Sequence, residues 1–245
     1  MPAEPRPPAP RLPTPDSRLP ITALILDFDG LIVDTESPAL QSWQMIYAEY
    51  GQVIEIDIWQ GALGTNHGFD ALAHLIDLVE AADPAQGANL RAFGPDILAR
   101  RRQIKDELSA AQPLLPGVAE LLDQADAAGL PCAVASSSGR GWVEGWLRRH
   151  GILGRFVCVR TAEDVARTKP APDLFLAAAA GLGRPPSECL VFEDSPNGIL
   201  AATAAGCPMV AVPGAVTAQI AMPPANLIMP RLDAMPLAEI IAAVA

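Results

Sequence analysis

The sequence predicts an α/β protein built on a doubly wound parallel sheet, and two observations support this. Short uninterrupted apolar runs, typical of strands buried on both faces, alternate with Ala- and Leu-rich segments of helical spacing. One interval between the first two runs is far longer than a crossover needs, and it is itself helical in pattern. We therefore expect a Rossmann-like sheet core with an inserted α-helical cap domain.

The first segment of the chain is rich in proline. Residues 1–18 hold seven prolines and almost no large apolar side chains, so we expect a disordered tail. The first strand is expected within 21–30 (ITALILDFDG), where an apolar run ends in Asp and Gly. Similar runs predict the later strands at 131–139, 156–160, 189–195, 208–214 and 226–230.

Helical patterns fill the intervals between these runs. Three helical patterns lie C-terminal to residue 111, at 117–129, 172–183 and 197–206. Those of the long first interval lie at 40–51, 68–82 and 96–111, and a Pro-rich stretch (QPLLPG) closes the interval. The predicted domains are a helical cap over 36–111 and an α/β core made of 19–35 and 112–245.

Composition narrows the class of protein. Lys and Arg number 17 against 28 Asp and Glu, and a net charge of −11 disfavours nucleic acid or an anionic membrane as the main partner. No apolar run approaches the roughly 20 residues that span a bilayer, and the N-terminus has no signal-peptide pattern, so we expect a cytoplasmic protein. The four cysteines lack metal-ligand spacing and are expected to be reduced core thiols.

Polar side chains gather where the predicted strands end. Asp27 and Asp29 follow the first run, three serines (136–138) follow the second, and Glu193 and Asp194 end the fourth. Ligands of open α/β sheets bind at the carboxyl ends of the strands, so we expect these groups to converge there. Clustered carboxylates are tolerable when they share a hard divalent cation such as Mg²⁺, while hydroxyls and Lys169 offer donors for a phosphate.

Four ordered motifs carry a family resemblance: DFDGLIVDTE at 27–36, VASSS at 134–138, TKPAPD at 168–173 and FEDSPNGI at 192–199. In order and spacing they resemble the signatures of the haloacid dehalogenase (HAD) superfamily. The match is to the branch with a helical cap after the first strand, which contains β-phosphoglucomutases and small-molecule phosphatases. The resemblance covers nearly the whole chain after the Pro-rich tail.

The resemblance implies roles for the motif residues. Asp27 would be the nucleophile that forms an aspartyl-phosphate, and Asp29 the general acid and base. Mg²⁺ would be held by the Asp27 side chain, the Asp194 side chain and the backbone carbonyl of Asp29, with Glu193 as a further or outer ligand. Ser136 and the backbone N–H of Ser137 would bind the phosphate, and Lys169 would neutralise charge.

Taken without the motifs, the same residues allow other interpretations. The serines could form a turn and helix cap, Lys169 could be a loop cation, and Glu193 with Asp194 could cap the following helix. Asp34 is expected to bond backbone in the loop that leads to the cap. Arg140, His150, Trp142 and Trp146 are expected to belong to the surface or the core rather than to the site.

Candidate specificity residues lie in the cap. The Gly-rich stretch QGALGTNHG at 60–68 resembles in position a loop that related enzymes lower over the substrate, with Thr65, Asn66 and His67 as contact candidates. Asn66 and His67 could instead cap the next helix. Arg102 stands where relatives often have a basic cap residue, although three successive arginines are more often solvated.

The expected function is a Mg²⁺-dependent phosphatase of a small phosphorylated metabolite, acting as a monomer or weak homodimer. The alternatives are a β-phosphoglucomutase-type mutase and a non-catalytic protein on the same fold. Hydrolysis is favoured because β-phosphoglucomutases carry a cap-side histidine about ten residues after the second aspartate, where this chain has Ala39.

Overall fold

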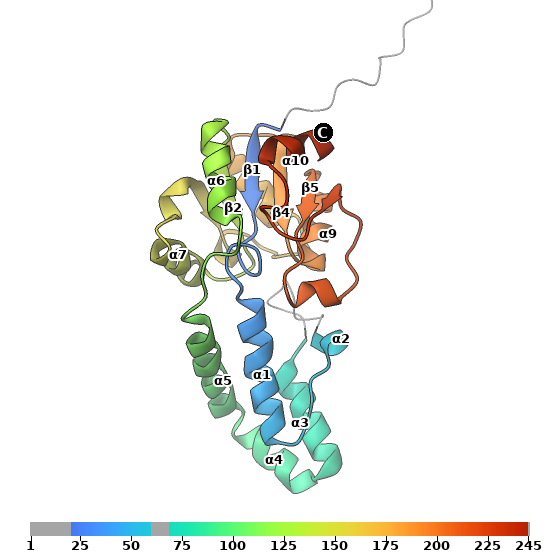
Figure 1. The fold of residues 1–245 in the computed structure, drawn as a ribbon. Coiled ribbons are helices and arrows are strands. Elements are labelled where there is room, and N and C mark those ends of the chain that lie inside the picture. Colours follow the sequence, from blue (N-terminus) through green and yellow to red (C-terminus); the bar gives the residue numbers. More distant parts are fainter. Residues whose placement is uncertain (1–20, 60–68, 245) are drawn as a thin grey trace, which may run out of the picture.

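The computed structural model describes residues 21–59 and 69–244 (Figure 1). Within these residues, parallel strands form one six-stranded sheet in the order β3-β2-β1-β4-β5-β6. The strands are β1 (Ala23–Leu26), β2 (Cys132–Ala135), β3 (Phe156–Arg160), β4 (Cys189–Glu193), β5 (Met209–Ala211) and β6 (Leu227–Ile228). The predicted doubly wound α/β sheet is confirmed, and every strand lies within a segment where an apolar run predicts one.

Helices cover both faces of the sheet. Leu24 and Leu26 pack with residues of α6 (Val118–Ala127), α7 (Arg140–Arg149) and α10 (Leu237–Val244). Ala23 and Ile25 point the other way and pack with α8 (Asp173–Leu182) and α9 (Pro196–Ala205). Because successive side chains of a strand face opposite sides, a strand covered on both faces must be apolar at every position, as β1 is.

The long interval after β1 is helical, as the sequence predicts. Its helices are α1 (Glu36–Glu49), α2 (Ile56–Trp59), α3 (Ala71–Ala82), α4 (Pro84–Ala92) and α5 (Gly94–Ser109). They share an apolar cluster that includes Trp43, Tyr47 and Leu75, and Val216 of the core joins it. Figure 1 shows them as an elongated group below the sheet, on the side to which β1 points. Helices α1 to α5 form the cap. That a separate cap domain extends over 36–111 stays a prediction.

The strand order places a crevice beside the first strand. The chain runs from β1 outward to β2 and β3, then returns to add β4 on the other side of β1. Leu26 of β1 lies opposite Phe192 of β4, so the residues that follow each of them are brought side by side. Such a reversal of strand order is the usual ligand position in open α/β sheets.

Two further expectations concern the cysteines and membranes. The four cysteines, all within the described residues, are free; Cys132, Cys189 and Cys207 are buried and Cys158 is half-buried. Burial raises the pKa of Cys132 to about 12, which makes it an unreactive thiol. No helix in the described part of the chain has the length and apolar character needed to cross a membrane.

Candidate active site

Three carboxylates from adjacent strand ends meet at the crevice. Asp27 follows β1, Glu193 ends β4, and Asp194 comes next. One carboxylate oxygen from each of the three lies within 4.8 Å of the others, and all three side chains are buried. Burial, and after it the charge of Glu193, raises the pKa of Asp27 well above its ordinary value. The pKa of Asp194 is raised by the same two causes, so the cluster is short of positive charge.

Lys169 supplies one cation to this cluster. Its ammonium group donates to Oδ1 of Asp27 and, at 2.8 Å, to Oε2 of Glu193. Burial alone would lower the pKa of Lys169, but the charges of Asp27 and Glu193 outweigh burial and raise it. The side chain is 2% exposed, so a loop cation in contact with solvent is excluded. Lys169 is therefore charged at neutral pH and aimed at the nucleophile candidate.

Two glycines make the close packing of the carboxylates possible. Gly30 has φ +85°, and a Cβ on it would overlap the carboxylate of Asp194. A Cβ on Gly198, at the start of α9, would overlap the carboxylate of Glu193. Glu193 also accepts from the backbone N–H and the hydroxyl of Ser195, while the Ser195 hydroxyl in turn caps α9 by accepting from Gly198 N at 3.1 Å.

Asp29 occupies a separate position, surrounded by donors. Among the described residues, four side chains donate to its carboxylate. Thr35 Oγ1 and Trp142 Nε1 donate to Oδ1 at 2.7 and 2.9 Å, whereas Ser136 Oγ and Ser138 Oγ donate to Oδ2 at 3.1 and 2.6 Å. Asp27 and Asp29 therefore differ in surroundings, one facing an ammonium group and the other facing hydroxyl and indole donors.

The serines after β2 serve the site and the loop together. Ser136 Oγ accepts from the backbone N–H of Ser138 at 3.0 Å while donating to Asp29, so the predicted turn is present and is joined to the site. Ser137 is buried next to it. The binding of a phosphoryl group by Ser136 and Ser137 stays a prediction.

The loop that leads to the cap carries two more acids. Asp34 Oδ1 accepts from the backbone N–H of Ser37 at 2.9 Å, which confirms its predicted bond to backbone. Burial, and then the charge of Asp29, raises the pKa of Glu36 to about 8. Both acids line a small cavity of about 70 Å³ that Asp194 and Thr217 also border. This cavity has room for water beside the carboxylate cluster.

Two cations of helix α5 contact neighbouring helices, Arg101 in the cap and Lys105 in the core. Arg102, the predicted cap residue, is exposed. Arg101 instead places its guanidinium over the Trp43 ring and donates to the Ala39 carbonyl at 3.2 Å. Lys105, one turn later, places its ammonium 4.4 Å from the ring centroid of Trp142. Thr65, Asn66 and His67 lie outside the described residues.

Sequence reasoning missed two members of the site. Trp142 was expected at the surface or in the core, but its indole N–H bonds Asp29. Thr35, which is 2% exposed, was not singled out although its hydroxyl bonds the same carboxylate. The sequence position of Trp142 could have indicated its role in the site. Trp142 lies in the first turn of α7, the helix that follows the serine loop, and this end of α7 faces the crevice.

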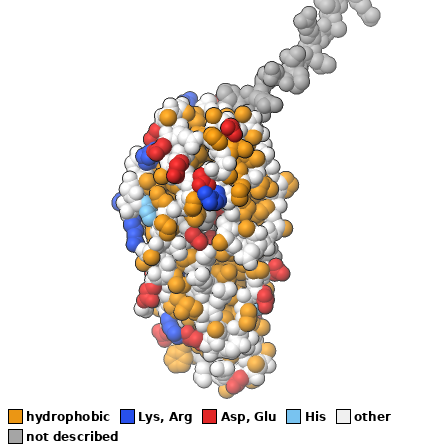
Figure 2. Space-filling model, viewed as in Figure 1, with side chains coloured by type: hydrophobic (Ala, Val, Ile, Leu, Met, Phe, Trp, Pro, Cys, Tyr) orange, Lys and Arg blue, Asp and Glu red, His pale blue; other side chains and the backbone are white. Residues whose placement is uncertain are grey.

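Figure 2 shows how charged and apolar side chains are distributed over one face of the molecule. Acidic and basic side chains are interspersed with apolar ones there, and basic groups do not gather in one patch.

Comparisons with known proteins agree with this geometry. The family model described as "haloacid dehalogenase-like hydrolase" matches residues 21–206. YhcW of Bacillus subtilis (strain 168) is 39% identical over 197 residues, which cover 80% of this chain and 86% of YhcW. Hexitol phosphatase B of Escherichia coli (strain K12) is 31% identical over 197 residues, with coverage of 79% and 84%.

A solved structure extends the comparison to the fold. The crystal structure of CbbY from Rhodobacter sphaeroides in complex with phosphate superposes with a TM-score of 0.67 and 25% identity. The superposition covers 89% of this chain and 98% of CbbY. The family model spans all four motifs and most of the sheet, and the relatives are matched along most of their length. The chain therefore belongs to the haloacid dehalogenase-like hydrolases.

Proposed function

We propose that this enzyme hydrolyses a small phosphorylated metabolite, a sugar or polyol phosphate monoester, with Mg²⁺ as cofactor and an aspartyl-phosphate on Asp27 as intermediate. The observation that carries the proposal is the buried cluster of Asp27, Glu193 and Asp194 around a single lysine. A cytoplasmic monomer or weak homodimer that binds neither nucleic acid nor membranes is part of the same proposal.

The charges of the cluster fit a divalent cation. Three buried carboxylates face one ammonium group, which leaves two negative charges uncompensated, and burial of unpaired charge is costly. The oxygen-only donor set suits Mg²⁺, which binds through one or two carboxylates and keeps several waters. Asp27 and Asp194 would hold the ion, with the Asp29 backbone carbonyl as a third ligand. Glu193 would serve mainly to fix Lys169 and Ser195, which its two oxygens already contact.

When bound, Mg²⁺ would act as a Lewis acid that draws charge from the phosphoryl oxygens and helps to keep Asp27 ionised. The first chemical step belongs to Asp27, whose carboxylate oxygen attacks phosphorus while the bond to the ester oxygen breaks. Asp29 gives its proton to the departing oxygen, so the alcohol leaves neutral. Lys169 neutralises charge on the nucleophile and on the phosphoryl group throughout.

The second step reverses the role of Asp29. Its carboxylate takes a proton from water, and the water oxygen attacks the phosphorus of the aspartyl-phosphate. The bond from phosphorus to Asp27 breaks, which releases inorganic phosphate and restores both carboxyl groups to their starting states. The two aspartates have separate surroundings, an ammonium group at Asp27 and hydroxyl and indole donors at Asp29, so they can take different roles.

The substrate class rests on the relatives. Hexitol phosphatase B, by its name, acts on a polyol phosphate, and CbbY binds phosphate in its crystal. This chain matches 84% of hexitol phosphatase B and 98% of CbbY, which supports a shared cap as well as a shared core. The described cap adds Arg101 and Lys105, which suit an anionic substrate, on the side of α5 that faces α1 and α7.

The test measures phosphate release from a panel of phosphorylated sugars, polyols, nucleotides and acids, with and without Mg²⁺. Wild type should release phosphate only with Mg²⁺, and Asp27→Asn should retain less than about a thousandth of the activity. The exposed Asp57→Asn in α2 is the matched control and should keep full activity. Rapid acid quenching followed by peptide mass analysis should find the phosphoryl group on the peptide that contains Asp27. Turnover by Asp27→Asn, or a phosphoryl group on another peptide, would contradict the proposal.

A further inference from the structure

Trp142 joins the proposed acid/base to a cap residue. Its indole N–H donates to Asp29 Oδ1 at 2.9 Å, and its ring carries the ammonium of Lys105 from helix α5 at 4.4 Å. Asp29 lies in the core, Lys105 in the cap, and Trp142 contacts both. The indole nitrogen has one N–H and no acceptor, so this contact can only direct a hydrogen bond toward an oxygen.

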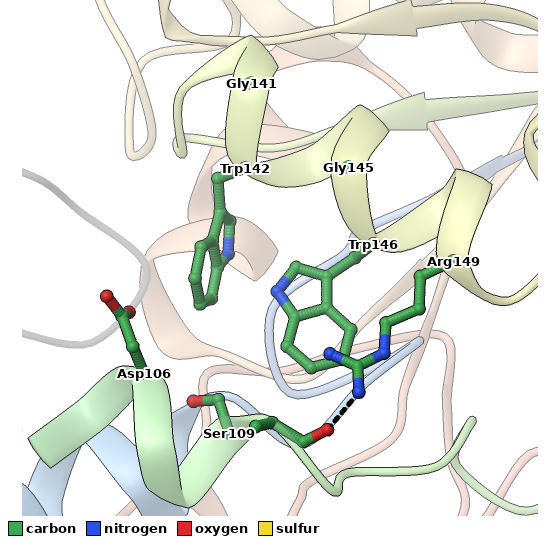
Figure 3. Close-up of a pocket in the computed structure, with 8 residues that line it drawn as sticks. Asp106, Ser109, Gly141, Trp142, Gly145, Trp146 and Arg149 are labelled. Carbon is green, nitrogen blue, oxygen red and sulfur yellow. Dashed lines mark hydrogen bonds between the residues drawn. The ribbon is translucent and has the colours of Figure 1, made fainter. Parts of the chain in front are cut away.

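The position of the ring is fixed from several sides. Trp142 packs edge-on against Trp146, one turn later in α7, with ring centroids 5.7 Å apart. Figure 3 shows the Trp142 ring extending from α7 toward Asp106 and Ser109 of α5, across a cleft of about 360 Å³ between the two helices. Gly141 and Gly145 place no side chain in this cleft, so it is lined from α7 by Trp142, Trp146 and Arg149.

The other three donors to Asp29 are hydroxyls. Thr35, Ser136 and Ser138 can each rotate to accept instead of donate, and each is attached to the loops that follow β1 and β2. Trp142 alone among these four comes from a helix, and its donor cannot change direction. Trp142 therefore fixes the orientation of Oδ1 of Asp29 more rigidly than the three hydroxyls do.

We propose that Trp142 is the positioning residue for Asp29, and that the contact of Lys105 with its ring passes the position of the cap to the acid/base. This inference rests on the proposed role of Asp29. An ion that lies over an aromatic face holds the ring in place, so movement of α5 changes how the ring, and with it the N–H, is held. The acid would then be aimed according to where the cap lies, and Trp142 itself would not contact the reacting atoms.

The kinetic test uses two leaving groups. An alkyl ester leaves as a strongly basic alkoxide and needs the proton of Asp29, whereas 4-nitrophenyl phosphate leaves as a weakly basic phenolate and does not. Trp142→Phe keeps an aromatic ring and removes the N–H. For the best alkyl phosphate of the panel, kcat/KM should fall about tenfold more than for 4-nitrophenyl phosphate, since kcat/KM covers the transfer to Asp27. Lys105→Met should also lower kcat/KM more for the alkyl phosphate than for 4-nitrophenyl phosphate, but by a smaller factor.

The matched control is Trp59→Phe. It removes an indole from helix α2 of the cap, and the N–H of this indole has no described hydrogen-bond partner. It should lower both rates equally, if at all. An equal loss for the two esters in Trp142→Phe, or the same unequal loss in Trp59→Phe, would overturn the assignment while leaving the phosphatase activity itself established.

A second measurement does not depend on activity. The chain has four tryptophans, so the indole region of a ¹H–¹⁵N spectrum holds four signals, and Trp142→Phe identifies the one that belongs to Trp142. Asp29→Ala should shift that signal upfield by removing a charged acceptor, and Lys105→Met should shift it by removing the cation over the ring. An unchanged Trp142 signal in Asp29→Ala would overturn the proposal even if no phosphate ester were hydrolysed.

Discussion

The ammonium of Lys169 lies 2.8 Å from Oε2 of Glu193, and both side chains are buried. The same ammonium also bonds Asp27, so one cation holds the nucleophile candidate against the end of the neighbouring strand. Removal of one partner from a buried ion pair leaves the other charge without compensation, which costs more free energy than the intact pair contributes. Lys169 is thus expected to matter for folding as well as for catalysis.

Lys169→Met should therefore lower the free energy of unfolding by about 3 kcal/mol at neutral pH without Mg²⁺, and it should abolish turnover. Arg167→Met, two residues earlier, is the control. Arg167 pairs with Asp173 at 3.0 Å, but its side chain is 71% exposed, so its loss should cost less than about 1 kcal/mol and leave activity intact. Urea unfolding of both variants gives the comparison, and equal losses would contradict the role given to burial.

Gly30 offers a test of the contact between the first loop and Asp194. Gly30 and Gly51 both have left-handed backbones, with φ +85° and +67°, but only at Gly30 would a Cβ overlap Asp194; at Gly51 nothing lies within 4 Å. Alanine at either position should cost about 1–2 kcal/mol of backbone strain. Gly30→Ala should in addition lose about a hundredfold in kcat/KM and need more Mg²⁺, because Asp194 is displaced.

Enzyme assays across a range of Mg²⁺ concentrations separate the two effects of alanine. Gly51→Ala should show the stability loss with normal Mg²⁺ dependence. If Gly30→Ala behaves in the same way, displacement of Asp194 does not affect the metal, and Asp194 is not a ligand.

The sequence was sufficient for the sheet and for the charged cluster because both depend on local patterns. A strand buried on two faces is apolar along most of its length, and the polar residues stand where such runs end: Asp27 after β1, Glu193 as the last residue of β4 and Asp194 after it. Parallel strands then bring these residues to one edge without further information. Asp34 was predictable for a similar reason, since its bond to Ser37 N spans three residues.

The contact between Trp142 and Asp29 could not be predicted in this way. The two residues are 113 positions apart, and α7 contains Gly141 and Gly145, which weaken its helical pattern. Helix α4 was missed for the same cause, since its sequence PAQGANLRA begins with proline and contains glycine. Its capping residue Asp83, which accepts from Ala85 N and Gln86 N, was the available signal.

The raised pKa of Glu36 predicts that the free energy of unfolding depends on pH. Its pKa is raised from 4.5 to about 8, first by burial and then by Asp29. The folded protein thus keeps the proton where the unfolded chain has lost it. The stability contributed by protonated Glu36 is fully present below its ordinary value of 4.5 and is lost as the pH rises through about 8.

Glu36→Gln, which stays neutral, should therefore be more stable than wild type at about pH 9, by about 1–2 kcal/mol, with little difference at about pH 4. Urea unfolding in EDTA at the two pH values measures the change. Glu239→Gln on α10, an exposed glutamate, serves as the control and should show no such difference. A constant difference between Glu36→Gln and wild type across this range would exclude a raised pKa at Glu36.

The final prediction separates hydrolysis from the mutase reaction of the β-phosphoglucomutases that this chain resembles. A mutase must protect its aspartyl-phosphate from water while a sugar bisphosphate turns around. In that group a cap-side histidine about ten residues after the second aspartate is expected to couple the acid/base to substrate. Here the position holds Ala39, a residue of α1 that is 8% exposed. Its methyl group can neither orient Asp29 nor sense a hydroxyl.

Among residues 21–59 and 69–244, the neighbourhood of Ala39 offers no substitute of the same kind. Arg101 bonds the Ala39 carbonyl at 3.2 Å, and a guanidinium does not exchange protons at neutral pH. Asp29 is instead held by Trp142 and hydroxyls, and none of these groups is a cap-side base that could tie the acid/base directly to a sugar hydroxyl. Water should therefore reach the aspartyl-phosphate before a second sugar hydroxyl does. Incubation with β-glucose 1-phosphate, catalytic glucose 1,6-bisphosphate and Mg²⁺ should release inorganic phosphate, slowly or not at all, with little glucose 6-phosphate. Formation of glucose 6-phosphate faster than phosphate release would show that the enzyme protects its intermediate, and the mutase alternative would then replace hydrolysis.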